Sequence, residues 1–221
     1  MHLLTTRTLY FRRADLLGDR FEGSTTKVNL EGRKAMVAHL IDLGTSEEKA
    51  TELVEKMREL SRAMPRWVFL NCWHEGTDES AAMWELYAQG EGSVAITTSF
   101  GRLRDSLKGE RHVHIGRVRY ADYETEVIET KNSLAPFLVK RTSFRHENEV
   151  RALVMKVNYD APFGPGLEEA ILVPVDIERL VREVVVSPLS THWIDVVKAV
   201  VKSLDLKIEV QPSALSAEPL W

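Results

Sequence analysis

The stretch that decides the fold is RWVFLNCWH at residues 66–74, then EGTDESAAMWELYA at 75–88 and QGEGSVAITTSF at 89–100. The apolar run from Trp67 to Cys72 predicts a buried strand. Thr77 or Asp78 predicts the cap of a helix of about three turns. Residues 93–98 predict a second strand. We therefore expect strand, short helix and strand to form the centre of the fold.

The composition is that of a globular protein with one core. Of 221 residues, 44% are hydrophobic and 28% are charged. The net charge of −4 argues against a general nucleic-acid or anionic-membrane binder, although a local basic groove is compatible with it. No apolar segment approaches the roughly 18 residues that a membrane span needs, and no signal-peptide core opens the chain. These features predict a cytoplasmic protein that does not bind membranes.

Two helices are predicted ahead of the central stretch. Met36, Val37, Leu40 and Ile41 recur at the helical period within residues 31–43. A capping box at residues 45–48 opens a second helix that runs to about residue 63. Both helices are strongly charged, so only one stripe of each can be buried. We expect a helical insertion over residues 31–64, packed on one side of a sheet.

Further strands and helices alternate irregularly along the chain. Alternating or apolar runs predict strands at residues 9–11, 112–120, 150–157, 170–175, 184–187 and 206–210, and helical periodicity predicts helices at 102–108, 132–140 and 192–204, the last capped by Thr191. The pattern predicts an α+β fold. We expect a single domain over residues 1–212, with a mixed, largely antiparallel sheet, flanking helices and a C-terminal tail at 213–221.

Ordinary catalytic signatures are absent from the sequence. It has no glycine-rich phosphate loop, no Gly-x-Ser-x-Gly elbow, no zinc quartet and no EF-hand loop. Cys72 lies on an apolar run, which predicts a small buried hydrophobe rather than a nucleophile. His112 and His114 would share a strand face, but no partner stands at metal-ligand spacing. No metal site is predicted.

Aromatic residues of the central stretch are the first candidates for a ligand site. Helical spacing puts Trp84 and Tyr87 on one face, and Trp73 and His74 are near them in sequence. Such a group suits stacking on a planar ring, for example a base or a nicotinamide. The alternative is that the tryptophans are core residues, as large aromatics mostly are.

Charged residues that precede an apolar strand are the second candidates. Alternation places Glu147, Glu149 and Arg151 on one strand face, with the two carboxylates about 7 Å apart. One acid could bind or deprotonate a hydroxyl while the arginine holds an anion. The alternative is a solvent-facing charge ladder that contributes little energy.

The loop from Asp19 to Gly23 is the third candidate. It reads DRFEG, an acidic pair around an aromatic residue before a glycine. Either the loop lines a site, or buried Phe21 pins it while Asp19 and Glu22 cap nearby amides.

Taken together, these motifs resemble the bacterial domain-of-unknown-function family numbered 2971. The resemblance covers about residues 3–210, without the helical insertion. Family members usually begin with an additional short segment that carries a basic residue and a tyrosine, and we expect this element to be missing or reduced to His2. The matching pieces are LYF at 9–11, DRFEG at 19–23, CWH at 72–74, Met83-Trp84-x-x-Tyr87 with Gly92, and Glu147-x-Glu149-x-Arg151.

The layout of that family is also similar, more distantly, to the ADP-ribosyltransferase-like superfamily, which binds NAD. The resemblance implies that Glu149, or Glu147, binds ribose hydroxyls and stabilises positive charge at the anomeric carbon. It implies that Tyr87 or Trp84 stacks on nicotinamide, and that the Asp19–Gly23 loop lines the pocket. His2 and Arg7 are the candidates for the early basic residue.

Three functions follow as expectations. The first is a transferase of the stress or phage-defence type that uses NAD or another nucleotide, with NAD as the candidate cofactor. The second is a non-catalytic module that recognises a nucleotide or a nucleic-acid end through the same pocket and Arg117 and Arg119. The third is a metal-dependent nuclease. The sequence decides neither whether the protein is an enzyme nor its oligomeric state.

Overall fold

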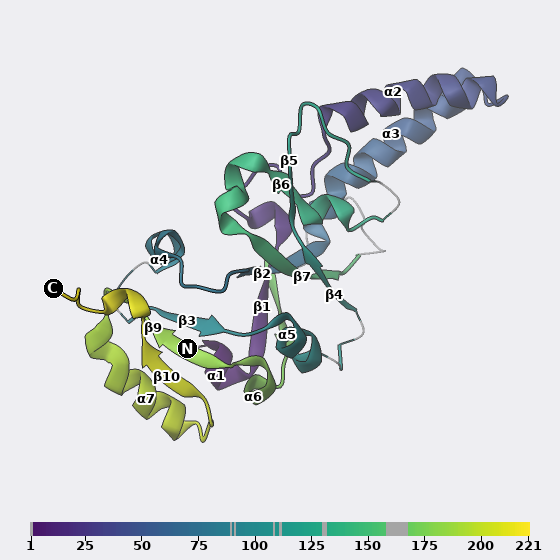
Figure 1. Ribbon diagram of the computed structural model, residues 1–221. Helices are drawn as coiled ribbons and strands as arrows, with labels where there is room; N and C mark the ends of the chain where they lie inside the picture. The colour runs from purple at the N-terminus through teal and green to yellow at the C-terminus, as the bar shows by residue number, and fades with distance from the viewer. Residues whose placement is uncertain are drawn as a thin grey trace. The chain divides into compact units, whose positions relative to one another are not determined.

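The computed structural model describes residues 2–88, 90, 92–107, 109–110, 112–129, 132–157 and 168–221. The chain forms two compact units (Figure 1). Unit 1 comprises Met1–Tyr10, Glu75–Arg111 and Leu172–Trp221, and unit 2 comprises Phe11–His74 and His112–Ile171. The single domain over residues 1–212 stays a prediction.

A five-stranded sheet has the strand order β4-β7-β2-β1-β8, and it confirms the predicted strand after Trp67. The pairs β1–β2, β2–β7 and β4–β7 are antiparallel. A separate two-stranded sheet in unit 2 pairs β5 with β6 in parallel. The strands are β1 (Thr8–Arg13), β2 (Val68–His74), β4 (Val113–Arg117), β5 (Arg119–Ala121), β6 (Val139–Arg141), β7 (Glu149–Met155) and β8 (Ala170–Pro174).

Short 3-10 helices connect the strands of unit 2. They are η1 (Ala14–Leu16), η2 (Met64–Arg66), η3 (Ala135–Leu138) and η4 (Thr142–Glu147). The predicted helix at residues 132–140 is therefore wrong: a 3-10 helix with Pro136 at its start is followed by β6, because proline cannot donate the backbone hydrogen bond that a longer helix would need. The strand predicted at 112–120 is divided between β4 and β5.

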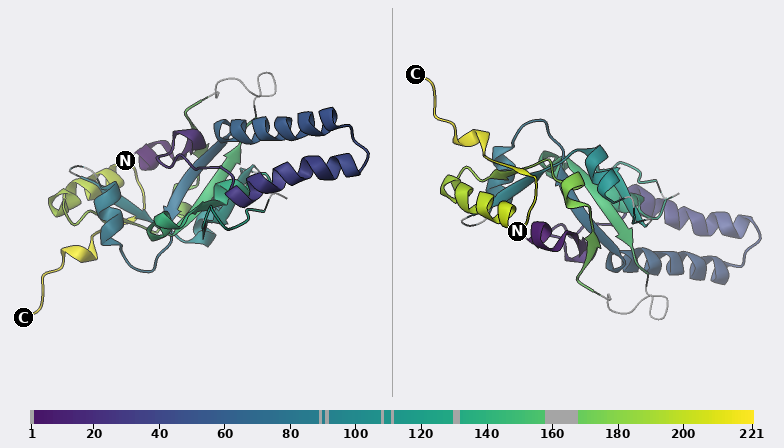
Figure 2. Two further views of the ribbon diagram at one scale, coloured as in Figure 1. Left: turned by 90° about the horizontal axis from the view of Figure 1, so that it is seen from above. Right: turned by 90° about the horizontal axis from the view of Figure 1, so that it is seen from below.

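The predicted helical insertion is an antiparallel pair, α2 (Lys27–Asp42) and α3 (Glu47–Ala63), which lie side by side (Figure 2). Thr26 caps α2 by accepting from the backbone N–H of Asn29 at 3.2 Å, so this helix begins before residue 31. Ser46 is the N-cap of α3, but its side chain makes no capping hydrogen bond, and the predicted capping box is wrong.

Unit 1 contains a three-stranded sheet in the order β10-β9-β3, in which β10 and β9 are parallel. The central helix is shorter than predicted, because Ser80 rather than Thr77 or Asp78 caps it. Thr191 opens a 3-10 helix and does not cap the long helix that follows. The elements are α1 (His2–Thr6), α4 (Ala81–Tyr87), β3 (Val94–Thr97), α5 (Phe100–Ser106), α6 (Ile177–Leu180), β9 (Glu183–Val186), η5 (Thr191–Trp193), α7 (Ile194–Ser203), β10 (Glu209–Pro212) and η6 (Ala214–Ser216).

These elements confirm the α+β fold class. Among the described residues, no helix combines the length and apolar character that crossing a bilayer requires.

The core of unit 2 lies against one face of β2 and β7. Leu70 is in register with Leu153, and Cys72 with Arg151, so these four side chains share that face. The apolar part of the face belongs to a buried cluster of Ala14, Val68, Leu70, Leu134, Phe137 and Leu153. On this face of β2 and β7, the apolar core around Leu70 and Leu153 therefore lies next to the charged residue Arg151.

Gly23 occupies a position in unit 2 that other residues cannot fill. Its φ is +69°, and a Cβ atom there would lie 2.2 Å from the ring of fully buried Phe137. We expect Gly23→Ala to lower the free energy of unfolding by about 2–4 kcal/mol, from overpacking and backbone strain together. Urea denaturation measures the loss. Gly18→Ala is the matched control, because a Cβ at Gly18 meets nothing within 4 Å. Equal stability of the two variants would contradict this account of Gly23.

Candidate functional site

Five charged side chains are buried together in unit 2. We call them the ion cluster: Glu22, Lys140, Glu147, Glu149 and Arg151. Their side chains are between 0% and 10% exposed. Charged residues are almost never buried this completely unless they are paired. The predicted solvent-facing charge ladder is therefore wrong.

Arg151 is the centre of the ion cluster. Its guanidinium donates to both carboxylate oxygens of Glu22, at 2.7 and 2.8 Å, and to both oxygens of Glu149, at 2.8 and 3.1 Å. A fifth hydrogen bond, of 2.8 Å, goes to the backbone carbonyl of Phe137. A guanidinium has five N–H donors, and all five are used here. Arg151 is thus satisfied without any contact with solvent or a ligand.

Lys140 connects Glu147 and Glu149 within the ion cluster. Its ammonium donates to Glu149 Oε1 at 2.8 Å and to Glu147, and it lies 3.7 Å from Glu22 Oε1. The ammonium also lies 4.6 Å from the centre of the Phe144 ring, within cation–π range. Lys140 is not among the predicted site residues, because the pattern of residues 132–140 predicts a helix there and not the strand β6. One signal in the sequence could have indicated Lys140: two glutamates, Glu147 and Glu149, stand beside a single arginine, Arg151, so their burial requires a second cation.

Glu147 reaches the ion cluster by a route that differs from the prediction. It ends η4 rather than lying on β7, and Asn148 turns the chain between them with a φ of +38°. The backbone N–H of Glu149 then donates to the Tyr120 hydroxyl at 2.9 Å. His74 Nδ1 donates to the carbonyl of Glu147 at 2.7 Å. The two carboxylates are brought together as predicted, but a turn and Lys140 do this rather than strand alternation.

The two carboxyl groups have opposite pKa shifts. Burial, together with the neighbouring Glu149, raises the pKa of Glu147 in spite of Lys140. Burial would also raise the pKa of Glu149, but hydrogen bonds from Arg151 and Glu147 and the nearby cations lower it well below its usual range. Charge balance explains why the two pKa values shift in opposite directions, since the three carboxylates of the ion cluster face only its two cations, Lys140 and Arg151. A proton on Glu147 neutralises the ion cluster and leaves Glu149 as an anion.

The Asp19–Gly23 loop is held by ionic contacts. Asp19 accepts from Arg141 at 2.6 Å and from the backbone N–H of Phe21 at 3.1 Å, so its predicted capping role is confirmed. The Arg141 guanidinium lies 4.2 Å from the centre of the Phe21 ring. Phe21 itself is 41% exposed, so the prediction that its burial pins the loop is wrong. Glu22 pairs with Arg151 and Asp19 with Arg141, and these contacts fix the loop instead.

The second half of β2 carries exposed residues on the sheet face that also bears Arg151 and Glu149. Cys72 and His74 are exposed, and they are in register with Arg151 and Glu149. The predicted burial of Cys72 is therefore wrong. Trp73 points to the opposite face, where its indole N–H donates to Asn71 at 2.6 Å. Cys72 and His74 are therefore the exposed residues that border the charged end of this face.

The other predicted site residues belong to unit 1. Trp84 is partly buried and donates to Glu79 at 2.9 Å, while Tyr87 is largely exposed. Glu79 also accepts from Ser213 and from the backbone of Ala214 at 2.7 Å, so it links α4 to η6. Arg7 is exposed at the end of α1. Because these residues and the ion cluster lie in different units, the shared cleft stays a prediction.

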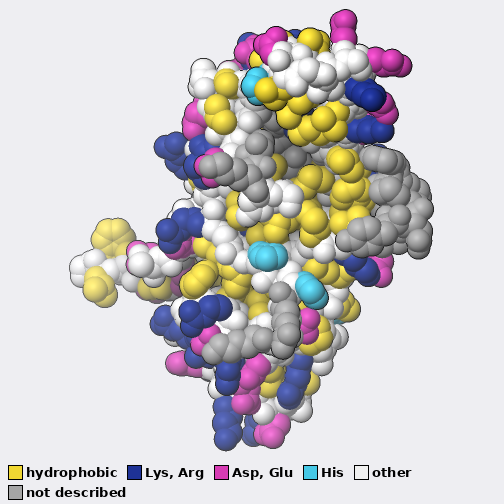
Figure 3. Space-filling model, turned by 90° about the vertical axis from the view of Figure 1, so that its right-hand side faces the viewer, with side chains coloured by type: hydrophobic (Ala, Val, Ile, Leu, Met, Phe, Trp, Pro, Cys, Tyr) yellow, Lys and Arg dark blue, Asp and Glu magenta, His cyan; other side chains and the backbone are white. Residues whose placement is uncertain are grey.

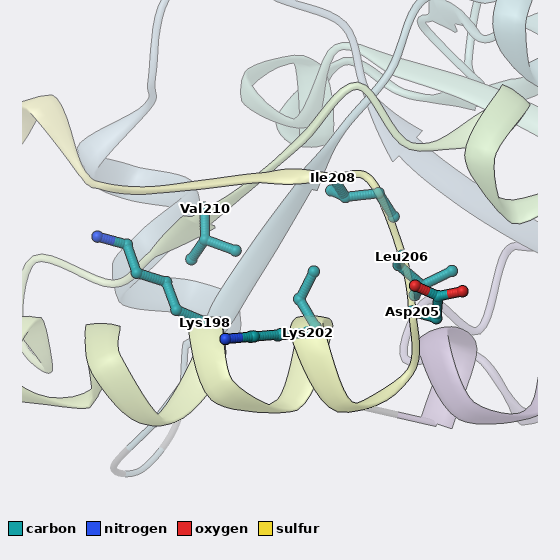
Figure 4. Close-up of a pocket in the computed structure, with 7 residues that line it drawn as sticks. Lys198, Lys202, Asp205, Leu206, Ile208 and Val210 are labelled. Carbon is teal, nitrogen blue, oxygen red and sulfur yellow. The ribbon is translucent and has the colours of Figure 1, made fainter.

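Unit 1 has an open hollow of about 240 Å³ between α7 and the segment leading into β10 (Figure 4). None of the predicted site residues lines it. Its lining combines charged side chains, two lysines and an aspartate, with four apolar ones. The lining residues are Lys198, Val201, Lys202, Asp205, Leu206, Ile208 and Val210.

Among the described residues, no group of three or more His, Cys, Asp or Glu side chains is arranged to hold a metal ion. In comparisons with known proteins, no family model, no curated protein and no solved structure matches this chain. The resemblance to the family numbered 2971 therefore stays a prediction that rests on the quoted motifs.

Removing the charge of Glu22 should destabilise the protein strongly. Glu22→Gln leaves the buried Arg151 with one carboxylate instead of two, and breaking a buried ion pair typically costs about 3–5 kcal/mol. We expect a loss of about 3 kcal/mol or more in urea denaturation. Glu124→Gln is the control, because Glu124 forms an exposed pair with Lys27 and should lose less than about 1 kcal/mol. Similar stabilities of the two variants would show that the bidentate pair is not needed.

The lowered pKa of Glu149 predicts a loss of stability in acid. The unfolded chain takes up a proton on this residue near its ordinary pKa of 4.5, before the folded chain does. Its contribution is therefore present above pH 4.5 and declines as the pH falls below that value. We expect Glu149→Gln to be less stable at pH 6 and to lose less further stability between pH 5 and 3 than the wild type. Urea midpoints across this range test the expectation, and parallel curves for the two proteins would contradict it.

Proposed function

We propose that the protein is a nucleotide-using transferase of the ADP-ribosyltransferase-like type, with NAD as the first candidate substrate. The observation that supports it is the pair Glu147 and Glu149, which share Lys140 and whose pKa values are shifted apart. Environments that separate the pKa values of two neighbouring groups are typical of sites where one group carries a proton and the other a charge.

The two glutamates suit different parts of such a reaction. Glu149 stays anionic and is fixed by Arg151 and Lys140, so it can stabilise positive charge at the anomeric carbon without reorganising. Glu147 binds a proton more readily than an ordinary glutamate, so in its ionised form it suits the base that takes the acceptor's proton. The C–N bond to nicotinamide breaks with its electron pair going to nicotinamide, the acceptor oxygen bonds to the anomeric carbon, and the acceptor's proton passes to Glu147.

The second candidate is a non-catalytic nucleotide-binding module. The complete pairing of Arg151 favours it, because a fully satisfied buried network is also how proteins rigidify a binding surface. Arg119, one of the two arginines expected to contact the ligand, gives this candidate less support than expected. Arg119 donates to Glu126 at 2.6 Å and to the carbonyl of Val127 at 3.1 Å, so it is engaged within the protein. The third candidate, a metal-dependent nuclease, gains no support from the described residues.

Release of nicotinamide from NAD tests the proposal directly. We expect the wild type to release nicotinamide in the presence of protein or small-molecule acceptors, and Glu147→Gln to reduce the rate a hundredfold or more. This variant should stay folded, because a neutral residue 147 leaves two carboxylates facing two cations. Glu124→Gln is the control and should keep the wild-type rate.

Thermal shift separates the two candidates. NAD at 100 times its dissociation constant should stabilise the folded protein by about 2.7 kcal/mol. Stabilisation without nicotinamide release would favour the binding module, with a panel of other nucleotides then identifying the ligand. If NAD and every nucleotide of the panel gave neither stabilisation nor nicotinamide release, both candidates would be contradicted.

A further inference from the structure

Arg141, at the end of β6, differs from Arg151 in how much of its guanidinium the protein satisfies. Only Nη2 donates to a described residue, the Asp19 carboxylate at 2.6 Å. Nε is buried and finds no acceptor among the described residues. Nη1 is not buried, and it donates to none of these residues either. Arg151 uses all five N–H groups, whereas Arg141 keeps donors that the described part of the chain does not use.

Three neighbours hold this guanidinium in place. Its carbon lies 4.2 Å from the centre of the Phe21 ring and 5.3 Å from the centre of the Phe144 ring, both within cation–π range. The third neighbour is Asp19, whose side chain is 2% exposed, whereas that of Arg141 is 35% exposed. Aromatic rings attract a guanidinium but supply no oxygen acceptor, so the remaining N–H groups need oxygen atoms from elsewhere. A donor that is already fixed loses little conformational entropy when it binds them.

Two exposed arginines lie close to Arg141. Arg20 and Arg145 directly adjoin Phe21 and Phe144 in the chain, so consecutive Cα atoms are about 3.8 Å apart. Neither arginine side chain pairs with a described residue. With every group ionised, the four carboxylates and three cations of the ion cluster and of the pair that Arg141 forms sum to −1, and the two exposed arginines raise this sum to +1. These nine groups together therefore attract an anion.

We propose that Arg141, with Arg20 and Arg145, forms a binding site for the phosphate group of a ligand. The Nη1 and Nη2 end of Arg141 offers the adjacent N–H donors that match two oxygens of one phosphate. Clusters of arginines are a recurrent means of recognising phosphate, which can carry more charge than a single carboxylate. The site goes beyond the proposed function, because any phosphorylated ligand satisfies it.

Isothermal titration calorimetry of the full chain with pyrophosphate tests the proposal. Arg141→Lys keeps a cation beside Asp19 but loses the planar fork, and it should raise the dissociation constant about tenfold or more. Arg145→Gln, at an exposed position where folding is not at risk, should raise it about threefold and reduce its salt dependence.

Arg58→Gln is the matched control, because it removes the same charge from an exposed arginine of α3 that is paired with Glu55. Figure 3 shows acidic and basic side chains intermixed at the free end of the α2–α3 pair, at its top. This variant should bind pyrophosphate like the wild type. Absence of binding to the wild type, an unchanged constant for Arg141→Lys, or equal effects of Arg145→Gln and Arg58→Gln would overturn the proposal.

Titrations with ADP, inorganic phosphate and acetate identify the source of the phosphate. Binding of ADP or of inorganic phosphate that depends on Arg141 supports the site, and the tighter of the two shows whether a nucleotide or a free phosphate supplies the group. Acetate bound as tightly as phosphate would overturn the assignment to phosphate.

The same variants separate this proposal from the proposed function. Pyrophosphate binding that depends on Arg141, without release of nicotinamide from NAD, would support the site and contradict only the transferase. Release of nicotinamide with an unchanged KM for NAD in Arg141→Lys, and no binding of pyrophosphate, would overturn only the phosphate site.

Discussion

The arrangement of several segments in unit 2 depends on the burial of one guanidinium, that of Arg151. Transferring an arginine from water to a protein interior costs several kcal/mol unless its charge and all its donors are matched. The Arg151 side chain is inaccessible to solvent, and the matching groups come from three separate parts of the chain: the loop after β1, η3 and the start of β7. Each of these parts is therefore held in place by one side chain. The order of the Asp19–Gly23 loop, which forms no regular secondary structure, follows from this requirement.

The chemistry of the two central carboxyl groups follows from the same arrangement. Glu149 borders Arg151 and Lys140, whereas Glu147 borders only Lys140 among the cations of the ion cluster. One carboxyl group is held charged, while the other gains affinity for a proton. This difference arises from the number of neighbouring cations and not from the identity of the residues, since both are glutamates.

The secondary structure could be predicted where local pattern decides it. The apolar run of β2, the alternation of β7 and the periodicity of α3 are properties of consecutive residues, and the elements follow them. Composition and alternation also identified Glu149 and Arg151 as unusual. The roles of these residues could not be predicted, because their burial depends on partners far away in the chain. Short-range pattern misplaced Lys140 in a helix, and it gave no sign that Asn148 would turn the chain between the two glutamates.

The long separations within the ion cluster have a consequence for the order of folding. Glu22 and Arg151 are 129 residues apart in the chain, and Asp19 and Arg141 are 122 residues apart. Contacts of such separation require closure of large loops, so they form after local helices and turns. Until then Arg151 remains hydrated, and the charged end of the sheet face is not assembled. The candidate site is thus a late product of folding. A ligand that recognises the assembled ion cluster would therefore bind the native chain in preference to the unfolded one.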